Sequence, residues 1–315
     1  MENTASRILP VVRDIINEVK KAVVGKDDVI VKTVLAILAG GHILLEDMPG
    51  VGKTTLAIAF SRAMSLECTR IQFTADVMPS DVTGFTALNR ATGAFEFHKG
   101  AAFCNMLLAD EINRTSSRTQ SALLEAMEEH SVTVDGVTHK LPEPYIVIAT
   151  QNPVGSAGTQ LLPESQLDRF MVRLSLGYPD ADSETQILKN RSSVWNADSV
   201  HPVVTAEQLY SIRRMTADIY ADDKVCRYVA DIAASTRNSS EILLGISTRG
   251  AIAVLAMAKA TAVLKGRDYV IPDDVDYVLL PTAAHRLILA SHSKNAADAG
   301  RALKNAAGSV RSAGF

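Results

Sequence analysis

The pattern of hydrophobic and polar residues changes near residue 180. Before this position, short apolar runs alternate with stretches of helical spacing. Five of these runs have the length and composition of buried strands, at residues 42–46, 69–74, 106–110, 145–150 and 170–176. Strands that alternate with helices predict a mostly parallel sheet covered by helices. We therefore expect an α/β domain over residues 1–180.

After residue 180 no strand pattern recurs, and the apolar residues follow helical spacing. Thr205, followed three residues later by Gln208, predicts a capping box at the start of one helix. We expect an all-α second domain over residues 181–315. Its end, from about residue 294, is rich in alanine and polar residues, and we expect it to be only partly ordered.

The stretch "DMPGVGKT", residues 47–54, matches most of the phosphate-loop pattern G-x-x-x-x-G-K-[ST]. Gly52, Lys53 and Thr54 fill its end, whereas Asp47 stands at the first position. Backbone N–H groups in such a loop surround an anion at a helix N-terminus. Because aspartate tolerates a left-handed turn better than most residues, we interpret Asp47 as a substitute for glycine there. The alternative is a chance match at a strand–turn–helix junction.

Polar residues follow two of the predicted strands. Lys53 would reach the β- and γ-phosphates, and the Thr54 hydroxyl would bind Mg²⁺. A buried strand that ends in Asp110 and Glu111 is costly unless the carboxylates serve a cation or a proton. Asp110 would hold Mg²⁺ through water, and Glu111 would orient and polarise the attacking water. Asn152 would hydrogen-bond a γ-phosphate or that water. Considered without the other motifs, Asn152 would be interpreted as an ordinary loop residue. Together these motifs predict nucleotide hydrolysis at the carboxyl edge of the sheet.

The sequence resembles the MoxR family of AAA+ ATPases over about residues 8 to 290. The stretches that carry the resemblance are "LLEDMPGVGKTTLA", "LLADEINRTSSRTQSALLEAMEEHSVTVDG", "VIATQNP", "GTQLLPESQLDRF" and "GISTRGAIAVLAMAKA". It implies an AAA+ P-loop NTPase core with a parallel five-stranded sheet, a helix-2 insert and a pre-sensor 1 hairpin, followed by an all-α lid domain. It also implies ATP and Mg²⁺ as ligands and a ring of identical subunits, expected to be a hexamer. The client would be a protein, often one with a von Willebrand factor A domain, that undergoes maturation, metal insertion or complex assembly.

The resemblance assigns roles residue by residue. Lys53 and Thr54 match the Walker A pair, and Asp110 and Glu111 match Walker B. The residues with implied catalytic roles are Lys53, Asp110, Glu111, sensor 1 Asn152, arginine finger Arg169 and sensor 2 Arg249. The implied nucleotide-binding residues are Val23, Val24, Gly25, Pro49, Gly50, Val51, Gly52, Lys53, Thr54 and Thr55. The implied metal ligands are Thr54 and Asp110.

Both arginines also have a physical rationale. Arg249 lies at the start of a predicted helix, where the helix dipole repels a cation unless an anion is nearby. Its alternative is a solvated arginine. Arg169 lies beside Asp168 and would form an ordinary salt bridge with it, but its context favours a finger that acts on the nucleotide of a neighbouring subunit.

Two inserts are predicted to project from the core. Val132 and Val134 alternate with polar residues, the Asp135–Gly136 pair is typical of a type I′ turn, and Val137 resumes the strand. This hairpin precedes the sensor 1 strand. Residues 75–103 resemble the helix-2 insert of related AAA+ proteins. Both are expected to face a central pore or a client, and the alternative is a surface elaboration without contacts.

Charge and composition narrow the function classes. A net charge of −3 argues against a nucleic-acid partner. Three widely spaced cysteines favour a reducing compartment. The first residues have no signal-peptide pattern, and Lys32 and His42 interrupt the most apolar run, 29–45, too soon for a membrane span. We expect a cytoplasmic protein without a membrane segment of its own. A nucleic-acid motor and a magnesium-chelatase-like ATPase subunit remain the alternatives.

Overall fold

The computed structural model describes residues 4–48, 50–152, 162–190, 199–291, 293 and 295–312. Its central sheet has five parallel strands: β1 (Ile43–Glu46), β2 (Cys68–Gln72), β5 (Met106–Asp110), β8 (Ile146–Gln151) and β9 (Val172–Leu174). Their order across the sheet is β2-β5-β8-β1-β9. Each strand overlaps one of the five predicted runs, so the predicted sheet is confirmed.

Helices cover both faces of the sheet, which explains why β5 and β8 are buried along their whole length. On one face lie α1 (Thr4–Ala22), α2 (Asp27–Leu38) and α3 (Lys53–Ala63). On the other face α5 (Ser117–Glu129) packs through Leu123 and Leu124 against Leu107 and Val147 of the sheet. Because all five strands run in parallel, their carboxyl ends meet at one edge.

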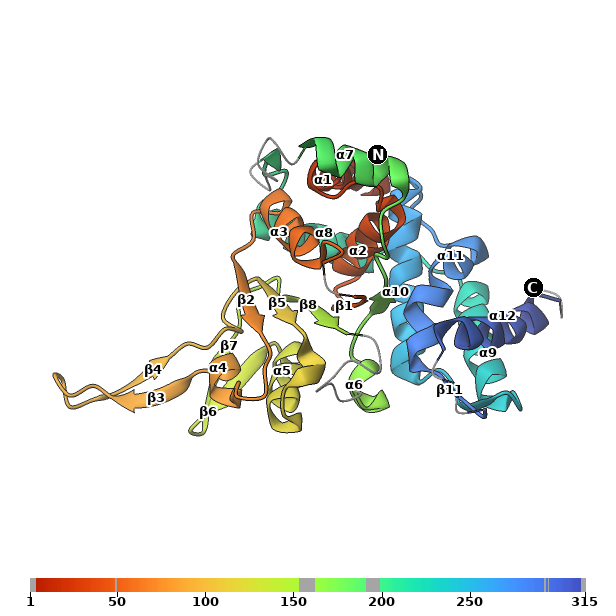
Figure 1. The fold of residues 1–315 in the computed structure, drawn as a ribbon. Helices are drawn as coiled ribbons and strands as arrows, with labels where there is room; N and C mark the ends of the chain where they lie inside the picture. Colours follow the sequence, from red (N-terminus) through yellow and green to blue (C-terminus); the bar gives the residue numbers. More distant parts are fainter. Residues whose placement is uncertain are drawn as a thin grey trace.

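Two β-hairpins extend from the core (Figure 1). The insert contains the short helix α4 (Pro79–Thr83) and the antiparallel pair β3 (Phe85–Leu88) and β4 (Phe95–His98). The second hairpin pairs β6 (Ser131–Val134) with β7 (Val137–Lys140). Asp135 and Gly136 have φ values of 50° and 78°, as a type I′ turn requires, so the predicted hairpin is confirmed.

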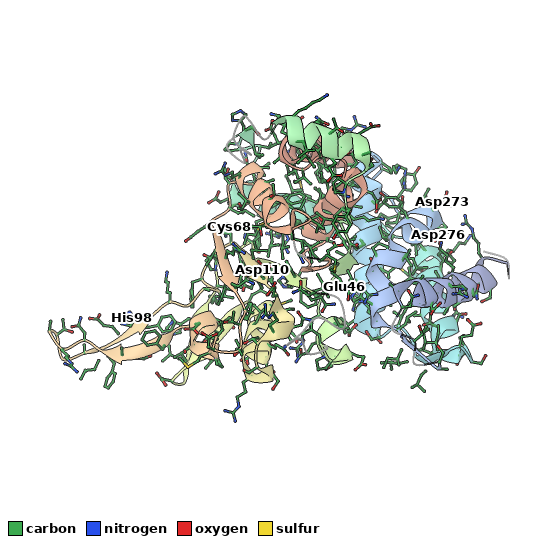
Figure 2. The ribbon with its side chains drawn as sticks, in the orientation of Figure 1. Glu46, Cys68, His98, Asp110, Asp273 and Asp276 are labelled. Carbon is green, nitrogen blue, oxygen red and sulfur yellow. The ribbon has the colours of Figure 1, made fainter. Side chains whose placement is uncertain are left out.

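The two hairpins are in contact through aromatic side chains. Phe97 of the insert stacks on His139 of β7 with ring centroids 3.9 Å apart. Phe97 also meets the ring of Phe103 edge-on. Asp110 lies near the middle of the molecule, whereas His98 lies out along the insert (Figure 2). Phe97 pairs with Thr86, next to the Phe85–His98 pair that lies farthest from the turn, so the stacking joins the β6–β7 hairpin to the inner end of the β3–β4 hairpin.

The rest of the chain is mainly helical. After the short helix α6 (Glu164–Leu167) and strand β9, it forms α7 (Ala181–Asn190), α8 (Ala206–Ala217), α9 (Asp223–Asn238), α10 (Thr248–Leu264), α11 (Pro272–Ala283) and α12 (Ala296–Ser312). The predicted capping box is confirmed, because Thr205 Oγ1 accepts from Gln208 N and Gln208 Oε1 accepts from Thr205 N. The chain also forms two 3₁₀ turns, η1 (Ile112–Arg114) and η3 (Ala284–Arg286).

Two details of this second part differ from the sequence expectation. β10 (Ile242–Leu244) and β11 (Ile288–Leu289) form a small antiparallel ribbon inside the otherwise helical part. Strands of two or three residues are too short to show an alternating pattern. The alanine-rich tail forms α12, which packs on α9 through a hydrogen bond from Ser235 Oγ to the Ala306 carbonyl. The expectation of partial order was wrong for this helix, because its alanines bury a face.

The apolar core continues across the change in pattern at residue 180. α10 packs against α1 and α2, and one hydrophobic cluster contains both Ile15 and Val34 of these helices and Val254 and Met257 of α10. A division into domains 1–180 and 181–315 therefore remains a proposal about chain organisation, and the two parts share their core. Among the described residues, no helix combines the length and apolar character needed to cross a membrane.

Candidate nucleotide site

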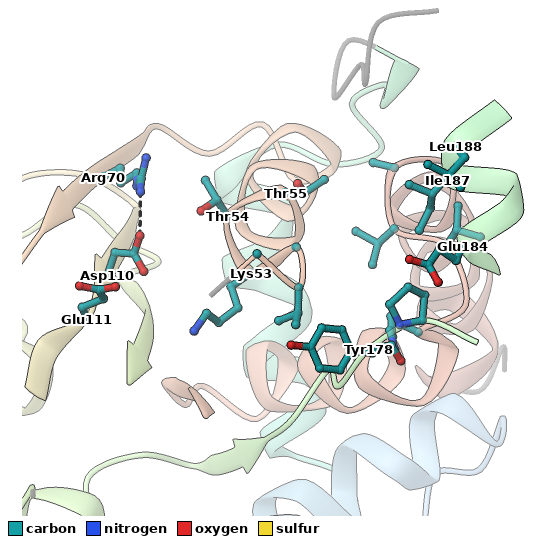
Figure 3. A pocket seen from close by; sticks show the side chains of 18 of the residues that line it. Lys53, Thr54, Thr55, Arg70, Asp110, Glu111, Tyr178, Glu184, Ile187 and Leu188 are labelled. Atoms are coloured by element: carbon teal, nitrogen blue, oxygen red, sulfur yellow. Dashed lines mark hydrogen bonds and ion pairs between the residues drawn. The ribbon is translucent and has the colours of Figure 1, made fainter. Parts of the chain in front are cut away.

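A cavity of about 920 Å³ lies beside the carboxyl ends of the central strands. It is lined by the turn after α1, the loop before α3, the ends of β2 and β5, and the segment after β9. In Figure 3, Lys53 lies between Asp110 on one side and Tyr178 on the other. The predicted nucleotide-binding residues that line the cavity are Val23, Val24, Gly50, Val51, Gly52, Lys53, Thr54 and Thr55.

The loop before α3 has the open backbone that a phosphate requires. Gly50 and Gly52 have φ values of 86° and 98°, and a Cβ atom at either position would have no atom of the described residues within 4 Å. Gly52 precedes α3 without a side-chain cap, so the first N–H groups of α3 have no cap acceptor. Pro49, also predicted to bind nucleotide, lies outside the described residues.

Lys53 is buried at the first position of α3, and its Nζ donates a hydrogen bond to the Asp47 carbonyl at 2.8 Å. Burial lowers the pKa of Lys53, and the carboxylates of Asp110, Asp47 and Glu111 oppose this shift. The ammonium group is therefore held at the inner end of the loop by a carbonyl and surrounding negative charge, where it can meet an anionic ligand.

Asp110 has both carboxylate oxygens engaged at the end of β5. Its Oδ1 accepts from Thr150 Oγ1 at 2.6 Å, and its Oδ2 accepts from Arg70 at 2.7 Å. Arg70 comes from the edge strand β2 and lines the same cavity. Sequence reasoning missed this residue, because an arginine on an exposed edge strand carries no distinguishing signal.

Glu111 has a backbone conformation that fixes its direction. Its φ of 58° is left-handed, which is strained for a residue other than glycine, and its N–H donates to Thr150 Oγ1. Asn152 Nδ2 donates to Glu111 Oε1 at 3.2 Å and Arg114 donates to Oε2 at 2.8 Å. Burial raises the pKa of Glu111, but the hydrogen bonds from Arg114 and Asn152 outweigh it, and the pKa is lowered. The carboxylate is therefore ionised and directed.

Asn152 completes this group from the end of β8. Its backbone N–H and carbonyl bond the side chain of Asn113. Its Oδ1 is buried without a hydrogen-bond partner among the described residues. Such an acceptor is costly to leave unpaired, so a donor from a bound ligand or water would stabilise it.

Comparison with known proteins identifies the family. Residues 42–172 match the model of the ATPase family associated with various cellular activities (AAA), and residues 234–305 match that of the AAA lid domain. YeaC of Bacillus subtilis, named an uncharacterized protein, is 45% identical over 285 residues, which cover 90% of this chain and 89% of YeaC. Chaperone MoxR1 of Mycobacterium tuberculosis is 34% identical over 281 residues, which cover 86% of this chain and 74% of the relative. The chain belongs to the MoxR family of AAA+ ATPases.

A crystal structure of a candidate ATPase from Cytophaga hutchinsonii agrees with this assignment. It superimposes on the MoxR-family chain with a TM-score of 0.87 at 36% sequence identity. The match covers 98% of this chain and 96% of that one. The five-stranded AAA+ sheet and the helical lid are thus shared over nearly the whole length.

Arg169 and Arg249, two of the predicted site residues of this MoxR-family chain, lie apart from the cavity, and Asn152 is also not among the described residues that line it. Arg169 and Arg249 both pair with Glu128 of α5: Arg169 Nε lies 3.1 Å from Oε2, and Arg249 bonds Oε1. All three line a separate hollow of about 270 Å³. The two arginines are therefore brought together with each other, and not with the phosphate loop of their own chain. Sequence reasoning missed Glu128.

The alternative for Arg169, a salt bridge to Asp168, is wrong for the described residues. Asp168 instead pairs with the buried Arg286 and accepts from Ser247 Oγ at 3.0 Å. Arg286 also donates to the carbonyl of Phe170. Because Arg286 and Ser247 come from the second part of the chain, Asp168 joins the two parts. The carboxylate of Asp168 is thus paired with Arg286 and not with the neighbouring Arg169.

One further interpretation of the site needs correction, and one predicted role is untested. Gly25 is not among the described residues that line the cavity; its backbone lies against Ser183 of α7, and its role in nucleotide binding stays a prediction. Asp47 is not among the residues with positive φ, so its interpretation as a left-handed turn residue was wrong. Its carboxylate binds the segment after β9 instead. Sequence reasoning also missed the cavity wall that continues from that segment, because the residues that line it, between Tyr178 and Leu188, are not buried and belong to no motif.

Proposed function

We propose that this MoxR-family protein binds ATP with Mg²⁺ in the cavity, hydrolyses it, and uses the reaction to remodel a client protein. The observation that carries this proposal is the division of charged residues. Lys53, Asp110 and Glu111 line one cavity, whereas Arg169 and Arg249 lie together outside its lining. One chain therefore holds half of an ATPase site, and a second copy would supply the rest.

The residues around the cavity fit an ATP–Mg²⁺ ligand. The space above Gly50 and Gly52 is open for phosphate, and the loop N–H groups and Lys53 would bind its charge. Carboxylate and hydroxyl oxygens suit Mg²⁺, so Asp110, through water, and Thr54 would hold the ion. When bound, Mg²⁺ would neutralise charge on the phosphates.

Glu111 would act as the group that orients and polarises the attacking water. Its ionised carboxylate can accept a proton from that water, and the hydrogen bonds from Arg114 and Asn152 hold it in one direction. The unpaired Oδ1 of Asn152 is a second acceptor beside it. Val23 and Val24 line the other end of the cavity, which suits an apolar base.

The arginine pair implies assembly. A cation that meets charge developing on the γ-phosphate accelerates hydrolysis by about 10³ to 10⁵. Arg169 would act on the nucleotide of the next subunit, and the pairing of both Arg169 and Arg249 with Glu128 supports the same direction for both. Head-to-tail contacts of this kind close into rings, and we expect a hexamer.

The hairpins supply a surface for a client. Phe95 at the start of β4 is 76% exposed, and Phe85 and Leu88 are also exposed. Exposed aromatic residues on a projecting hairpin are typical of contact surfaces. The relative named as a chaperone supports a protein client, and the family resemblance favours one with a von Willebrand factor A domain. Replacing Phe95 with serine should weaken binding to a purified client protein with a von Willebrand factor A domain, without loss of basal ATPase activity.

Two substitutions test the ATPase proposal. Lys53→Ala should weaken ATP binding, because it removes the cation that faces the phosphates. Glu111→Gln should keep ATP binding and abolish hydrolysis, because it alters only water activation. Glu125→Gln, on an exposed residue of α5 that is not among those described to line the cavity, is the matched control and should change neither. Binding is measured by calorimetry and turnover by phosphate release.

Equal losses of ATP affinity in both variants, with unchanged turnover of bound ATP, would contradict these roles. A strong stimulation of turnover by DNA would favour a nucleic-acid motor over a protein client.

The three described cysteines are free, which supports the proposed cytoplasmic location.

A further inference from the structure

Asp47 stands where the phosphate-loop pattern has glycine, and the residue is buried, with 7% of its surface exposed. Its Oδ1 accepts from Ser175 Oγ at 2.8 Å and from Gly177 N at 3.1 Å, and its Oδ2 accepts from Leu176 N at 2.5 Å. A buried carboxylate with three donors is a strong, directed contact. It joins the phosphate loop to a segment more than one hundred residues later in the chain.

That segment continues into a wall of the cavity that the turn after α1 contacts through Gly25 and Lys26. We call residues 175–188 the base-side wall. The side chains of this wall that line the cavity are Tyr178, Pro179, Glu184, Ile187 and Leu188. In Figure 3, Ile187 and Leu188 of α7 lie on the side of the cavity away from Asp110.

Leu176, near the start of the base-side wall, is buried in the hydrophobic core, whereas residues 177–189 that follow it are not buried. None of residues 181–189 is buried, so α7 contributes little hydrophobic stabilisation. Its position depends instead on polar contacts at its start: the three bonds to Asp47, a bond from Lys26 Nζ to the Tyr178 carbonyl at 2.7 Å, and the contact of Ser183 with the Gly25 backbone. Removing one of these contacts should therefore move the wall without unfolding the sheet.

We infer that Asp47 is a positioning residue: its carboxylate ties the base-side wall to the phosphate loop by hydrogen bonds. The parts of the site that bind the nucleoside and the phosphates of one ligand are thereby held at a fixed separation. This inference rests on the proposed nucleotide function. A glycine at this position would keep the loop but has no acceptor for the wall. Asp47 also carries the carbonyl that accepts from Lys53, so the same residue touches both ends of the site.

The test compares a ligand with a base and one without. ADP and inorganic pyrophosphate, each with Mg²⁺, are titrated into the full chain by calorimetry. In Asp47→Asn, the new amide N–H₂ group faces the Leu176 N–H or the Ser175 and Gly177 donors, so at least one of the hydrogen bonds to the wall is lost. The substitution should weaken ADP binding about 10- to 100-fold, as expected for losing bonds to a charged acceptor. Pyrophosphate, which does not reach the wall, should change by less than about threefold.

Asp182→Asn is the matched control. Asp182 is an exposed carboxylate of α7 that is not among the described residues lining the cavity, and its loss should leave both ligands unchanged. Ser175→Ala removes one donor from the other side of the contact at an exposed position, and should give a smaller loss, about 3- to 10-fold, for ADP alone. It keeps the inference testable if Asp47→Asn fails to fold. Hydrogen exchange of residues 181–189 should become faster in both variants.

Equal weakening of ADP and pyrophosphate by Asp47→Asn would show that the carboxylate serves only the phosphate loop, and would overturn the inference. Unchanged ADP affinity in both Asp47→Asn and Ser175→Ala would also overturn it. Failure of the unaltered protein to bind either ligand is a different result, and it would overturn the proposed nucleotide function itself.

Discussion

Replacing Arg169 with alanine should separate ATP binding from ATP hydrolysis. Arg169 is not among the described residues that line the cavity of its own chain, so each subunit should keep its affinity for ATP. The substitution removes a cation from the surface that would face the next subunit's γ-phosphate. We therefore expect normal binding and almost no turnover.

The expected magnitudes differ widely between stability and rate. Arg169 and Glu128 are each about one-third exposed, and ion pairs of this kind contribute about 0–1 kcal/mol. Glu128 also keeps its pairing with Arg249. Loss of an arginine finger, by contrast, lowers turnover by about 10³ to 10⁵, which corresponds to about 4–7 kcal/mol in the barrier. Unfolding and ATP binding should therefore be nearly unchanged in a variant that is nearly inactive.

Mixing two inactive variants makes the assay decisive. A junction is active when a subunit with intact Glu111 holds the nucleotide and its neighbour supplies an intact Arg169. In a random ring formed from equal amounts of Arg169→Ala and Glu111→Gln subunits, about a quarter of the junctions meet both conditions. Phosphate release should therefore recover to about a quarter of the unaltered value. Activity per chain of the unaltered protein should also rise with protein concentration.

Arg249 gives a second use of the same assay. If it acts on the neighbouring nucleotide together with Arg169, Arg249→Ala mixed with Glu111→Gln should also recover activity. If it acts on the nucleotide of its own chain, each active-site half remains defective and no mixture should recover. The shared contact with Glu128 favours recovery.

Arg227→Ala is the control for removing an arginine from an exposed ion pair. Arg227 pairs with Asp231 within α9, and its loss should leave turnover unchanged. The reasoning is refuted if the Arg169 and Glu111 variants show no recovery at any ratio and if unaltered activity does not depend on concentration. Arg169 would then have no role across a subunit junction.

Three further predictions concern stability and pH. Asp168→Asn should lower the free energy of unfolding by about 2–4 kcal/mol, seen as a lower urea midpoint, because the buried Arg286 loses its counter-ion and keeps only carbonyl partners. Arg114→Ala should raise the pKa of Glu111, since one of the two hydrogen bonds that lower it is lost; the fall of turnover on acidification should then begin at a higher pH. Burial lowers the pKa of His42 to about 3, so the unfolded chain binds a proton that the folded chain does not; stability should fall by about 2 kcal/mol from pH 7 to pH 5, and His42→Gln should remove this part of the loss in urea titrations.

His42 shows what a sequence-based interpretation of a histidine can and cannot establish. The seven histidines show no zinc-ligand spacing in the sequence, which leaves a solvated or structural role for each. In the structure the Nδ1 of His42 accepts from Val147 N and its Nε2–H donates to the Met127 carbonyl, so it joins β8 to the end of α5. No sequence pattern names these two partners, because both lie far along the chain.

The local elements could be predicted because each has its own short-range cause. Buried strands are continuous apolar runs, the β6–β7 hairpin follows from alternation around Asp135–Gly136, and the phosphate loop follows from glycine and a following helix. The catalytic candidates Lys53 and Asp110 were found because each lies at the end of a strand or the start of a helix. The parallel sheet then brings such ends to one edge.

Tertiary packing decided what the sequence pattern left open: the order of the strands, the partners of the charged residues, and whether short or weakly patterned segments such as β10, β11 and α12 form regular structure. Glu128 meets Arg169 and Arg249 only because α5, the segment before β9 and the start of α10 converge. Asp47 meets the turn after β9 only because β1 and β9 are neighbours in the sheet. Sequence patterns record the period of a strand or helix and the chemistry of a turn, which act within a few residues. Which distant groups come within hydrogen-bonding distance is decided by how the layers pack, because one change in packing alters many such pairs at once.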